Sequence, residues 1–179
     1  MQYAHQSGVS SYHLLPRLKR LDRWLCFQLR KEDGRMAKVP VTINEETNTP
    51  YRVSYRDPDN WRTYHEAKEI VDDNPAIDGL QIVVNDSRDP YVIIDFDNCV
   101  DPETKAIDPA ARRYLERTNT YAELSPSGTG FHLVFQGSVP RQGWTAETDA
   151  VDLEVYEKYI ITVTEDHLSG TPYEAKPAD

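Results

Sequence analysis

A short apolar run, Tyr91 to Ile94, leads into two aspartates, Asp95 and Asp97, and this segment limits the folds open to the chain more than any other. Consecutive apolar residues of this kind are typical of a buried strand. Side chains alternate along a strand, so residues two apart project from the same face. Two carboxylates on one face repel each other, and burial increases the repulsion. The run therefore predicts a strand that ends in either a metal site or two solvent-exposed acids.

Metal binding would remove the repulsion between these two acids. Mg²⁺ and Mn²⁺ bind carboxylate oxygens together with substrate phosphates. A pair of such ions stabilises the attacking and the leaving oxygen in phosphoryl transfer. Solvent-facing acids at a strand end are equally common, so the pair alone leaves both interpretations open.

A second element is the run Ser125-Pro-Ser-Gly-Thr-Gly-Phe-His132. Glycine lets a backbone approach a ligand closely, and the amides around Gly128 and Gly130 can form an anion-binding nest. Ser127 adds a hydroxyl, and His132 adds a ring nitrogen that can donate to a phosphate oxygen. A plain turn between two strands uses the same residue types. The run is therefore typical of a phosphate contact or of a structural turn, and both stay open.

A third element is the run Val151 to Tyr156, which alternates apolar and polar residues as a half-exposed strand does. Its polar positions include Asp152 and Glu154, and either one could supply a third carboxylate to a metal site. The alternation itself does not choose between them.

Helical and strand patterns are interleaved along the chain, which predicts an α+β fold with a mostly antiparallel sheet. The predicted helices cover 14–21, 61–72 and 109–118, the second capped by Asp59 or Asn60 and the third by Asp108. The predicted strands cover 24–29, 36–43, 80–84, 91–97, 121–124, 131–136, 152–156 and 159–164. Residues 32–34 are expected to turn a hairpin, 44–59 to form a loop, and 80–84 with 91–97 to form a second hairpin. Outside the main domain at 14–169 lie a loose segment at 1–13 and a tail at 170–179.

Composition excludes several classes of protein. Cys26 and Cys99 are the only cysteines, too few for a zinc site or a disulfide framework. A run of about 18 apolar residues and a signal-peptide core are both lacking, so we expect an intracellular protein without a membrane partner. The net charge of −10 fits either a solvated acidic face or adaptation to high salt. Nucleic-acid binding would then depend on local basic clusters, at 17–23, 30–38 or 112–117.

On these motifs the chain resembles the archaeo-eukaryotic primase, or primase-polymerase, superfamily. It looks closest to the primase domains of phage, viral and plasmid replication proteins. Residues 93–97 are similar to the first motif of that family, 125–132 to its second, and Glu154 with 158–164 to its third. The resemblance covers about residues 20 to 165.

The resemblance implies an enzyme that synthesises primers or extends strands on a single-stranded DNA template, using dNTPs or NTPs. Two divalent ions, Mg²⁺ or Mn²⁺, would be held by Asp95, Asp97 and Glu154. The nucleotide would be contacted by Ser127, Gly128, Gly130 and His132, with Lys38 and Lys158 as further candidates. Many relatives carry Arg where Lys158 stands, and the lysine keeps the charge but loses the bidentate fork. Glu165 stands where many relatives carry Gly.

The implied architecture is an N-terminal α/β module at about 14–78, packed on an RRM-like catalytic sheet at about 79–169, with the active site in the cleft between them. A helicase, fused or separate, is an expected partner, and a virus, phage or plasmid an expected source. Two other functions remain open. A non-catalytic module could bind single-stranded nucleic acid through exposed aromatics such as Tyr156 or Tyr159. A two-metal nuclease would share the acids but would not need the glycine turn.

Overall fold

The structure is a computed structural model that describes residues 13–84, 90–138, 144–148, 151–156 and 160–178, with the backbone alone at 144–148 and 151–156. In chain order the elements are α1 (Leu14–Leu18), β1 (Trp24–Glu32), β2 (Arg35–Asn44), β3 (Thr49–Arg52), a 3₁₀ turn (Pro58–Asn60), α2 (Tyr64–Asp73), β4 (Gly79–Val83), β5 (Tyr91–Asp97), α3 (Pro109–Thr118), β6 (Tyr121–Leu124), β7 (Phe131–Gln136), β8 (Trp144–Thr148), β9 (Val151–Tyr156), β10 (Ile160–Val163) and β11 (Lys176–Pro177).

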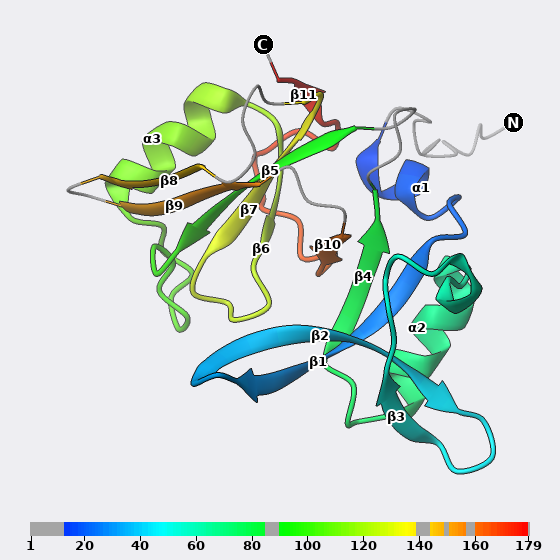
Figure 1. Ribbon diagram of the computed structural model, residues 1–179. Helices are drawn as coiled ribbons and strands as arrows, with labels where there is room; N and C mark the ends of the chain where they lie inside the picture. The colour runs from blue at the N-terminus through cyan, green and yellow to red at the C-terminus, as the bar shows by residue number, and fades with distance from the viewer. Residues whose placement is uncertain (1–12, 85–89, 139–143, 149–150, 157–159, 179) are drawn as a thin grey trace, which may run out of the picture.

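The strands form two sheets, which Figure 1 shows side by side. The first sheet has the order β10-β4-β1-β2-β3, and every pair in it is antiparallel. The second has the order β11-β7-β5-β9-β8, with β6 also paired to β7, and only the short β11 runs parallel to its neighbour. The predicted α+β class with mostly antiparallel pairing is confirmed.

Each sheet is covered by one long helix (Figure 1). Helix α2 buries Tyr64, Ala67 and Ile70 against the first sheet, and α3 buries Ala111 and Leu115 against the second. The two faces of β5 have different partners. Phe96 lies in the cluster under α3, whereas Tyr91 and Ile93 join the cluster of the first sheet. Since Asp95 and Asp97 share the face of Ile93, the fold turns both acids toward the first sheet.

Several local predictions are confirmed. Strands β1 and β2 form a hairpin whose register ends at Glu32 opposite Arg35, so Asp33 and Gly34 make the two-residue turn with φ of 48° and 82°. Helix α1 is present but ends earlier, at Leu18. Helix α3 begins at Pro109, and the Asp108 carboxylate accepts the N–H groups of the first turn.

The predicted cap of α2 was wrong. The helix begins at Tyr64, and Thr63 forms a capping box with Glu66: each side chain accepts the backbone N–H of the other. Asp59 and Asn60 lie instead in the preceding 3₁₀ turn, which Asp57 caps. Asp57 and Pro58 thus start a separate short turn, which ends before helix α2 begins.

Three predictions about strands were also wrong. Residues 44–59 are not all loop, because 49–52 pair with β2 as an edge strand, where Pro50 is tolerated. Strands β4 and β5 do not form a hairpin, because they belong to different sheets. Strand β8 has no counterpart in the prediction. The missed strands β3 and β8 each pair with a neighbour in the chain, β2 and β9, whereas β4 pairs with the distant β1 and β10.

Sheet membership also crosses the predicted module boundary. Strands β4 and β10 follow residue 78, yet both pair in the first sheet. The predicted tail contains β11, and its Tyr173 carbonyl accepts the N–H of Leu14 at 2.8 Å. The predicted loose segment 1–13 lies outside the described residues except for His13. Within the described residues, none of the helices is both long and apolar enough to span a membrane.

Candidate active site

The second sheet brings residues of the three predicted motifs into one row. Asp95 on β5 pairs with His132 on β7 at one side and with Glu154 on β9 at the other. Directly opposed residues of an antiparallel pair project from the same face, with their Cβ atoms about 4.5–5.5 Å apart. Only the backbone of Glu154 is described, so its place in the row rests on strand register. Residues that are far apart in the sequence are therefore neighbours on one face.

The register leaves both candidates for the third acid in place. Glu154 is paired with Asp95, and Asp152 is paired with Asp97. The strand face therefore carries four acids in two adjacent cross-strand pairs. By backbone register both candidates therefore lie opposite a β5 aspartate, and the register does not choose between them.

His132 is buried, with 4% of its surface exposed, and lies between two carboxylates. Its Nε2 atom is 3.4 Å from Oδ1 of Asp95, and its Nδ1 atom is 3.8 Å from Oε1 of Glu123. Within the part of the chain that is described, Asp95 Oδ1 and His132 Nδ1 are buried without a hydrogen-bond partner. An unsatisfied buried polar atom costs about 1–3 kcal/mol. Such atoms at the centre of an acidic row indicate a site whose ligand completes it.

Glu123 is a residue of this row that the sequence analysis missed. It lies on β6 directly opposite His132 and is only 2% exposed. Its carboxylate accepts hydrogen bonds from the Tyr121 hydroxyl at 2.9 Å and from the N–H groups of Thr164 at 3.0 Å and Glu165 at 3.3 Å. Burial, and then the nearby Glu123 carboxylate, raise the pKa of the Tyr121 hydroxyl, which therefore stays protonated as a donor. The signal available in the sequence was a single acid inside the apolar strand 121–124.

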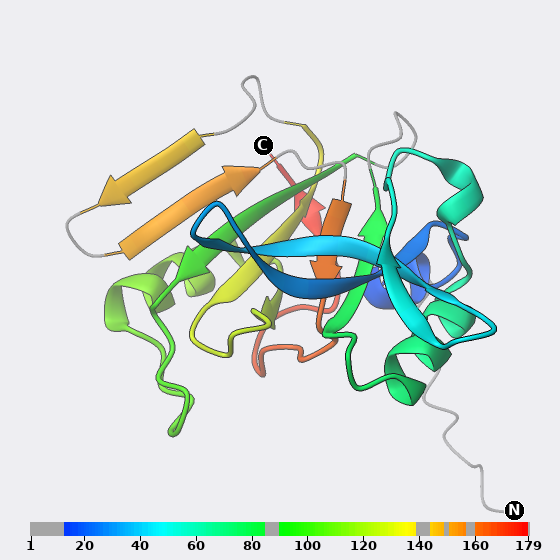
Figure 2. The same cartoon turned by 60° about the horizontal axis from the view of Figure 1, so that its bottom comes forward.

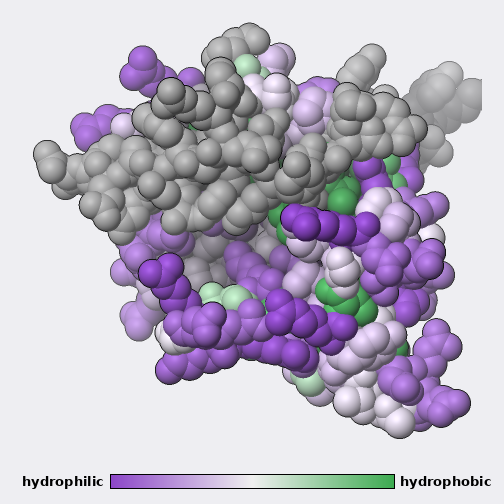
Figure 3. Space-filling model, viewed as in Figure 1, coloured by the Kyte–Doolittle hydropathy of each residue, from purple (hydrophilic) through white to green (hydrophobic). Residues whose placement is uncertain are grey.

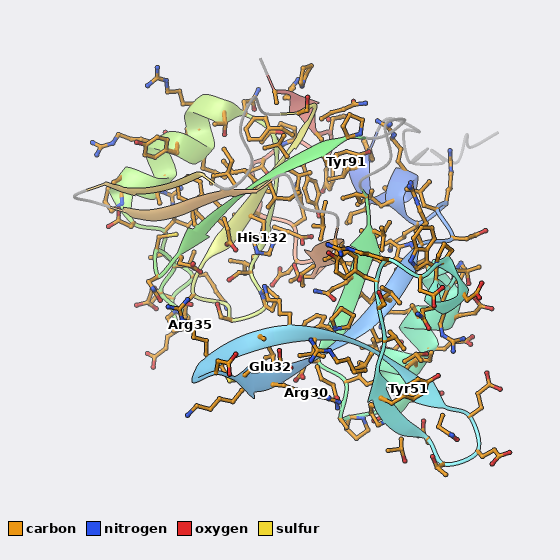
Figure 4. All side chains as sticks on the ribbon, in the orientation of Figure 1. Arg30, Glu32, Arg35, Tyr51, Tyr91 and His132 are labelled. Atoms are coloured by element: carbon orange, nitrogen blue, oxygen red, sulfur yellow. The ribbon has the colours of Figure 1, made fainter. Side chains whose placement is uncertain are left out.

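The row faces a cavity of about 440 Å³, here called the aspartate cavity. The second sheet contributes Ile93, Asp95, Asp97 and His132, and the first contributes Met36, Lys38, Gln81 and residues 160–162. Figure 4 shows His132 on the side of its sheet that is turned toward the first sheet. The volume lies in the range of small-molecule sites. Lys38, predicted from the sequence as a phosphate contact, is thus brought to the same cavity as the two aspartates.

The glycine turn lines a different cavity. Ser127 and Gly128 border a second space of about 440 Å³, here called the serine cavity, together with Lys105 and Glu165. Thr162 borders both cavities. The structure therefore brings His132 into the same cavity as the aspartates but places Ser127 and Gly128 in the adjoining serine cavity. Lys158 lies outside the described residues.

The two glycines of the turn have distinct local reasons. Gly128 has a φ of +72°, and its N–H donates to the Ser125 carbonyl at 2.9 Å, as a tight turn requires. Gly130 packs against β5, where a Cβ atom would lie 2.1 Å from the Phe96 carbonyl oxygen. Their predicted contacts with a nucleotide stay predictions. Lys105, which the sequence analysis did not select, holds its ammonium group 3.8 Å from where a Gly128 Cβ would stand.

Glu165 does not face the aspartates. Its carboxylate accepts a hydrogen bond from the Tyr64 hydroxyl at 3.0 Å and forms an ion pair with Lys19. Its φ of +63° lies in the left-handed region that favours glycine. The departure from Gly at this position therefore places an acid in the wall of the serine cavity, where Lys19 compensates its charge.

A comparison with curated proteins supports the resemblance to primase-polymerases that the motifs indicated. No family model matches the chain. It is 32% identical over 159 residues to a curated protein named DNA Primase-polymerase, from Nitratiruptor phage NrS-1. The match includes 87% of this chain and 21% of the phage protein, so the chain spans about a fifth of the length of that relative.

Proposed function

We propose that this chain is the catalytic domain of a DNA primase-polymerase, which adds nucleotides to a strand on a single-stranded DNA template by two-metal nucleotidyl transfer. The observation that carries the proposal is the row of His132, Asp95 and Glu154 beside the aspartate cavity. The name of the phage relative supports the reaction class. A helicase partner, the choice between dNTPs and NTPs, and an intracellular location stay predictions.

The residues of the row fit a pair of divalent cations. Asp95 Oδ1 is buried without a hydrogen-bond partner in the described part of the chain, and register places Asp97, Glu154 and Asp152 beside it. Mg²⁺ and Mn²⁺ prefer carboxylate oxygens, and their charge would offset the repulsion among these acids. The side chains that the structure describes do not by themselves include a group of three or more His, Cys, Asp or Glu able to hold an ion. The proposal therefore takes its third ligand from Glu154 or Asp152 on β9. When bound, the ions supply charge stabilisation for the attacking and leaving oxygens.

Other residues would bind and orient the nucleotide. Lys38 lines the aspartate cavity and can neutralise part of a triphosphate. The His132 ring would donate a hydrogen bond to a phosphate oxygen, and the Glu123 carboxylate lies on the far side of the ring, 3.8 Å from Nδ1. A nucleotide that contacts both His132 and Ser127 extends from the aspartate cavity past Thr162. The 3′-hydroxyl oxygen would then bond to the α-phosphorus as the bond to pyrophosphate breaks.

Primer extension on a single-stranded template, with nucleotides and Mg²⁺ or Mn²⁺, tests the proposal. We expect product from the parent protein, and a loss of about 10²–10³ in rate for Asp95→Asn or Asp97→Asn, the size typical of removing one charge-stabilising group from an active site. Asp22→Asn is the matched control, because Asp22 is exposed and lines neither cavity. Absence of product from the parent protein, or full activity in Asp95→Asn, would contradict the proposal. Template degradation would indicate a nuclease, and DNA binding without turnover would indicate a binding module.

A further inference from the structure

The β1–β2 hairpin extends beyond the rest of its sheet. Strand β1 pairs with β4 only over 24–27, and β2 pairs with β3 only over 41–44. From Gln28 opposite Val39 to Glu32 opposite Arg35, β1 and β2 pair only with each other among the described strands. We call this part of the hairpin the arm. Figures 1 and 2 show this arm reaching from the first sheet across toward the second. Such an arm contributes little to its own sheet, so its composition is free to serve another purpose.

One face of the arm carries only apolar and basic residues. Leu29 is paired with Lys38 and Lys31 with Met36, so these four side chains project together. Met36 and Lys38 line the aspartate cavity, which identifies this face as the one turned toward the active site. Leu29 is 42% exposed and Met36 64% exposed. We name these four residues the hairpin platform.

The two lysines of the platform form no ion pair with a residue whose side chain the structure describes, although the chain has a net charge of −10. Lys38 does share the aspartate cavity with Asp95 and Asp97. The acid nearest in sequence, Glu32, projects from the opposite face and forms an ion pair with Arg52 at 2.9 Å. Lys31 and Lys38 occupy diagonal positions of one strand pair, roughly 7–8 Å apart, so their like charges repel each other and favour an anion between them. The arrangement therefore fits an anionic partner that lies across the platform.

The surface around the platform is hydrophilic. Figure 3 shows hydrophilic residues gathered along the edge of the molecule formed by the arm, below a hollow of the surface. Figure 4 shows Arg30, Glu32 and Arg35 on the arm, and register puts Glu32 and Arg35 on the face opposite the platform. Glu32, the one acid on the paired strands of the arm, thus lies on the face away from the active site, and Asp33 lies in the turn.

We propose that the hairpin platform binds the backbone of the single-stranded DNA template and leads it into the aspartate cavity, an inference that rests on the proposed function. Lys31 and Lys38 contact phosphates, while Leu29 and Met36 give apolar contact to the sugars and bases between them. The platform carries phosphate-binding lysines and apolar side chains but no Asn, Gln, Arg, Asp or Glu, so we expect binding with little dependence on base sequence. Met36 and Lys38 belong to both the platform and the cavity, which makes the path continuous.

The test is binding of fluorescent oligo-dT, measured by anisotropy across a range of salt concentrations in EDTA and without nucleotide. The Lys31→Ala/Lys38→Ala variant should bind at least about tenfold more weakly at low salt, and its log–log salt slope should fall by about 1.4, since each single-strand phosphate contact contributes about 0.7. Leu29→Ser/Met36→Ser should weaken binding with the slope unchanged. The matched control is Arg112→Ala/Arg113→Ala, an equal charge change at exposed positions of α3, which should bind as the parent does.

Each outcome decides the inference. An unchanged slope in the lysine variant overturns it, and so does an equal loss in the α3 control, which would indicate a general effect of charge. All four substituted side chains of the platform are exposed, so the substitutions should not unfold the protein. A thermal melt equal to the parent's shows that the fold is retained. Binding and synthesis are separable, because the binding mixture holds neither metal nor nucleotide. If the parent protein extends primers and the lysine variant binds and extends equally well, the platform is refuted and the proposed function stands. If binding depends on the platform but the parent protein makes no product, the proposed function is refuted and the platform stands.

Discussion

Gly130→Ala is expected to damage both the stability and the site of this protein, because Gly130 is where the motif around Ser127 packs against the strand of the two aspartates. An added Cβ atom would lie 2.1 Å from the Phe96 carbonyl oxygen and 3.3 Å from the Asp97 Cα atom. Carbon–oxygen contacts in proteins settle near about 3.3 Å. The two backbones must therefore separate by about 1 Å, since neither atom belongs to a side chain that could rotate away.

The magnitude follows from this displacement. Overpacking a tight contact costs about 1–3 kcal/mol, and a backbone-to-backbone clash belongs at the upper end. At roughly 2–4 °C per kcal/mol for a chain of this size, the melting temperature should fall by about 6–12 °C. A shift of about 1 Å at Asp97 should also lower the rate of nucleotide addition by about 10²-fold.

The assay compares thermal melts and primer extension, the latter well below the melting transition. Gly34→Ala is the control, because Gly34 has a φ of +82° but no atom within 4 Å of an added Cβ. It should lose only the backbone strain, about 1 kcal/mol, and keep its activity. If Gly130→Ala melts no lower than Gly34→Ala, the close approach to β5 is not a constraint and the reasoning fails.

Three further substitutions test other parts of the fold. Glu123→Ala leaves the Tyr121 hydroxyl and two backbone N–H groups without an acceptor, so at about 1–3 kcal/mol for each donor the urea midpoint should drop sharply; an unchanged midpoint would contradict this. Burial raises the pKa of the Cys26 thiol from 9.0 to about 12, so its contribution to stability is complete below pH 9 and is lost as the pH rises toward 12, at about 1.4 kcal/mol per pH unit. Between pH 8 and pH 10, Cys26→Ala should therefore lose less stability in urea titrations than the parent, and an equal loss would contradict the burial argument. Thr63→Ala removes the cap of α2 and should cost about 1 kcal/mol in a thermal melt, whereas a parent-like melting temperature would show that the cap contributes nothing.

Sequence reasoning was most successful where the determining interactions are local. The turn at Asp33-Gly34, the Asp108 cap and the apolar strand before Asp95 each depend on residues close together in the chain. The relation of Asp95 to His132 and Glu154 could be expected from motif order and family resemblance, and strand register places them side by side.

What the sequence did not reveal has more than one source. Strand β3 pairs with the strand just before it, but Pro50 and its polar neighbours concealed its strand character, whereas β4 leaves β5 to join the distant β1. Glu123 was missed because its two backbone donors follow it by 41 and 42 residues, beyond the reach of any periodic pattern. Ser127 was expected beside the aspartates, but its turn opens onto the serine cavity because the residues between it and His132 carry the chain around the end of β5.

The position of β10 has a consequence for how the chain is made. This strand is the edge of the first sheet, yet it is synthesised after the other four strands of that sheet and after β5 to β9 of the second. The first sheet therefore cannot be completed while only its other four strands have been synthesised, and the edge of β4 stays open until Ile160–Val163 arrives. Open strand edges invite pairing with other chains. Since β9 directly precedes β10 and belongs to the other sheet, pairing of β10 with β4 closes the first sheet and also anchors one end of the strand that bears Glu154.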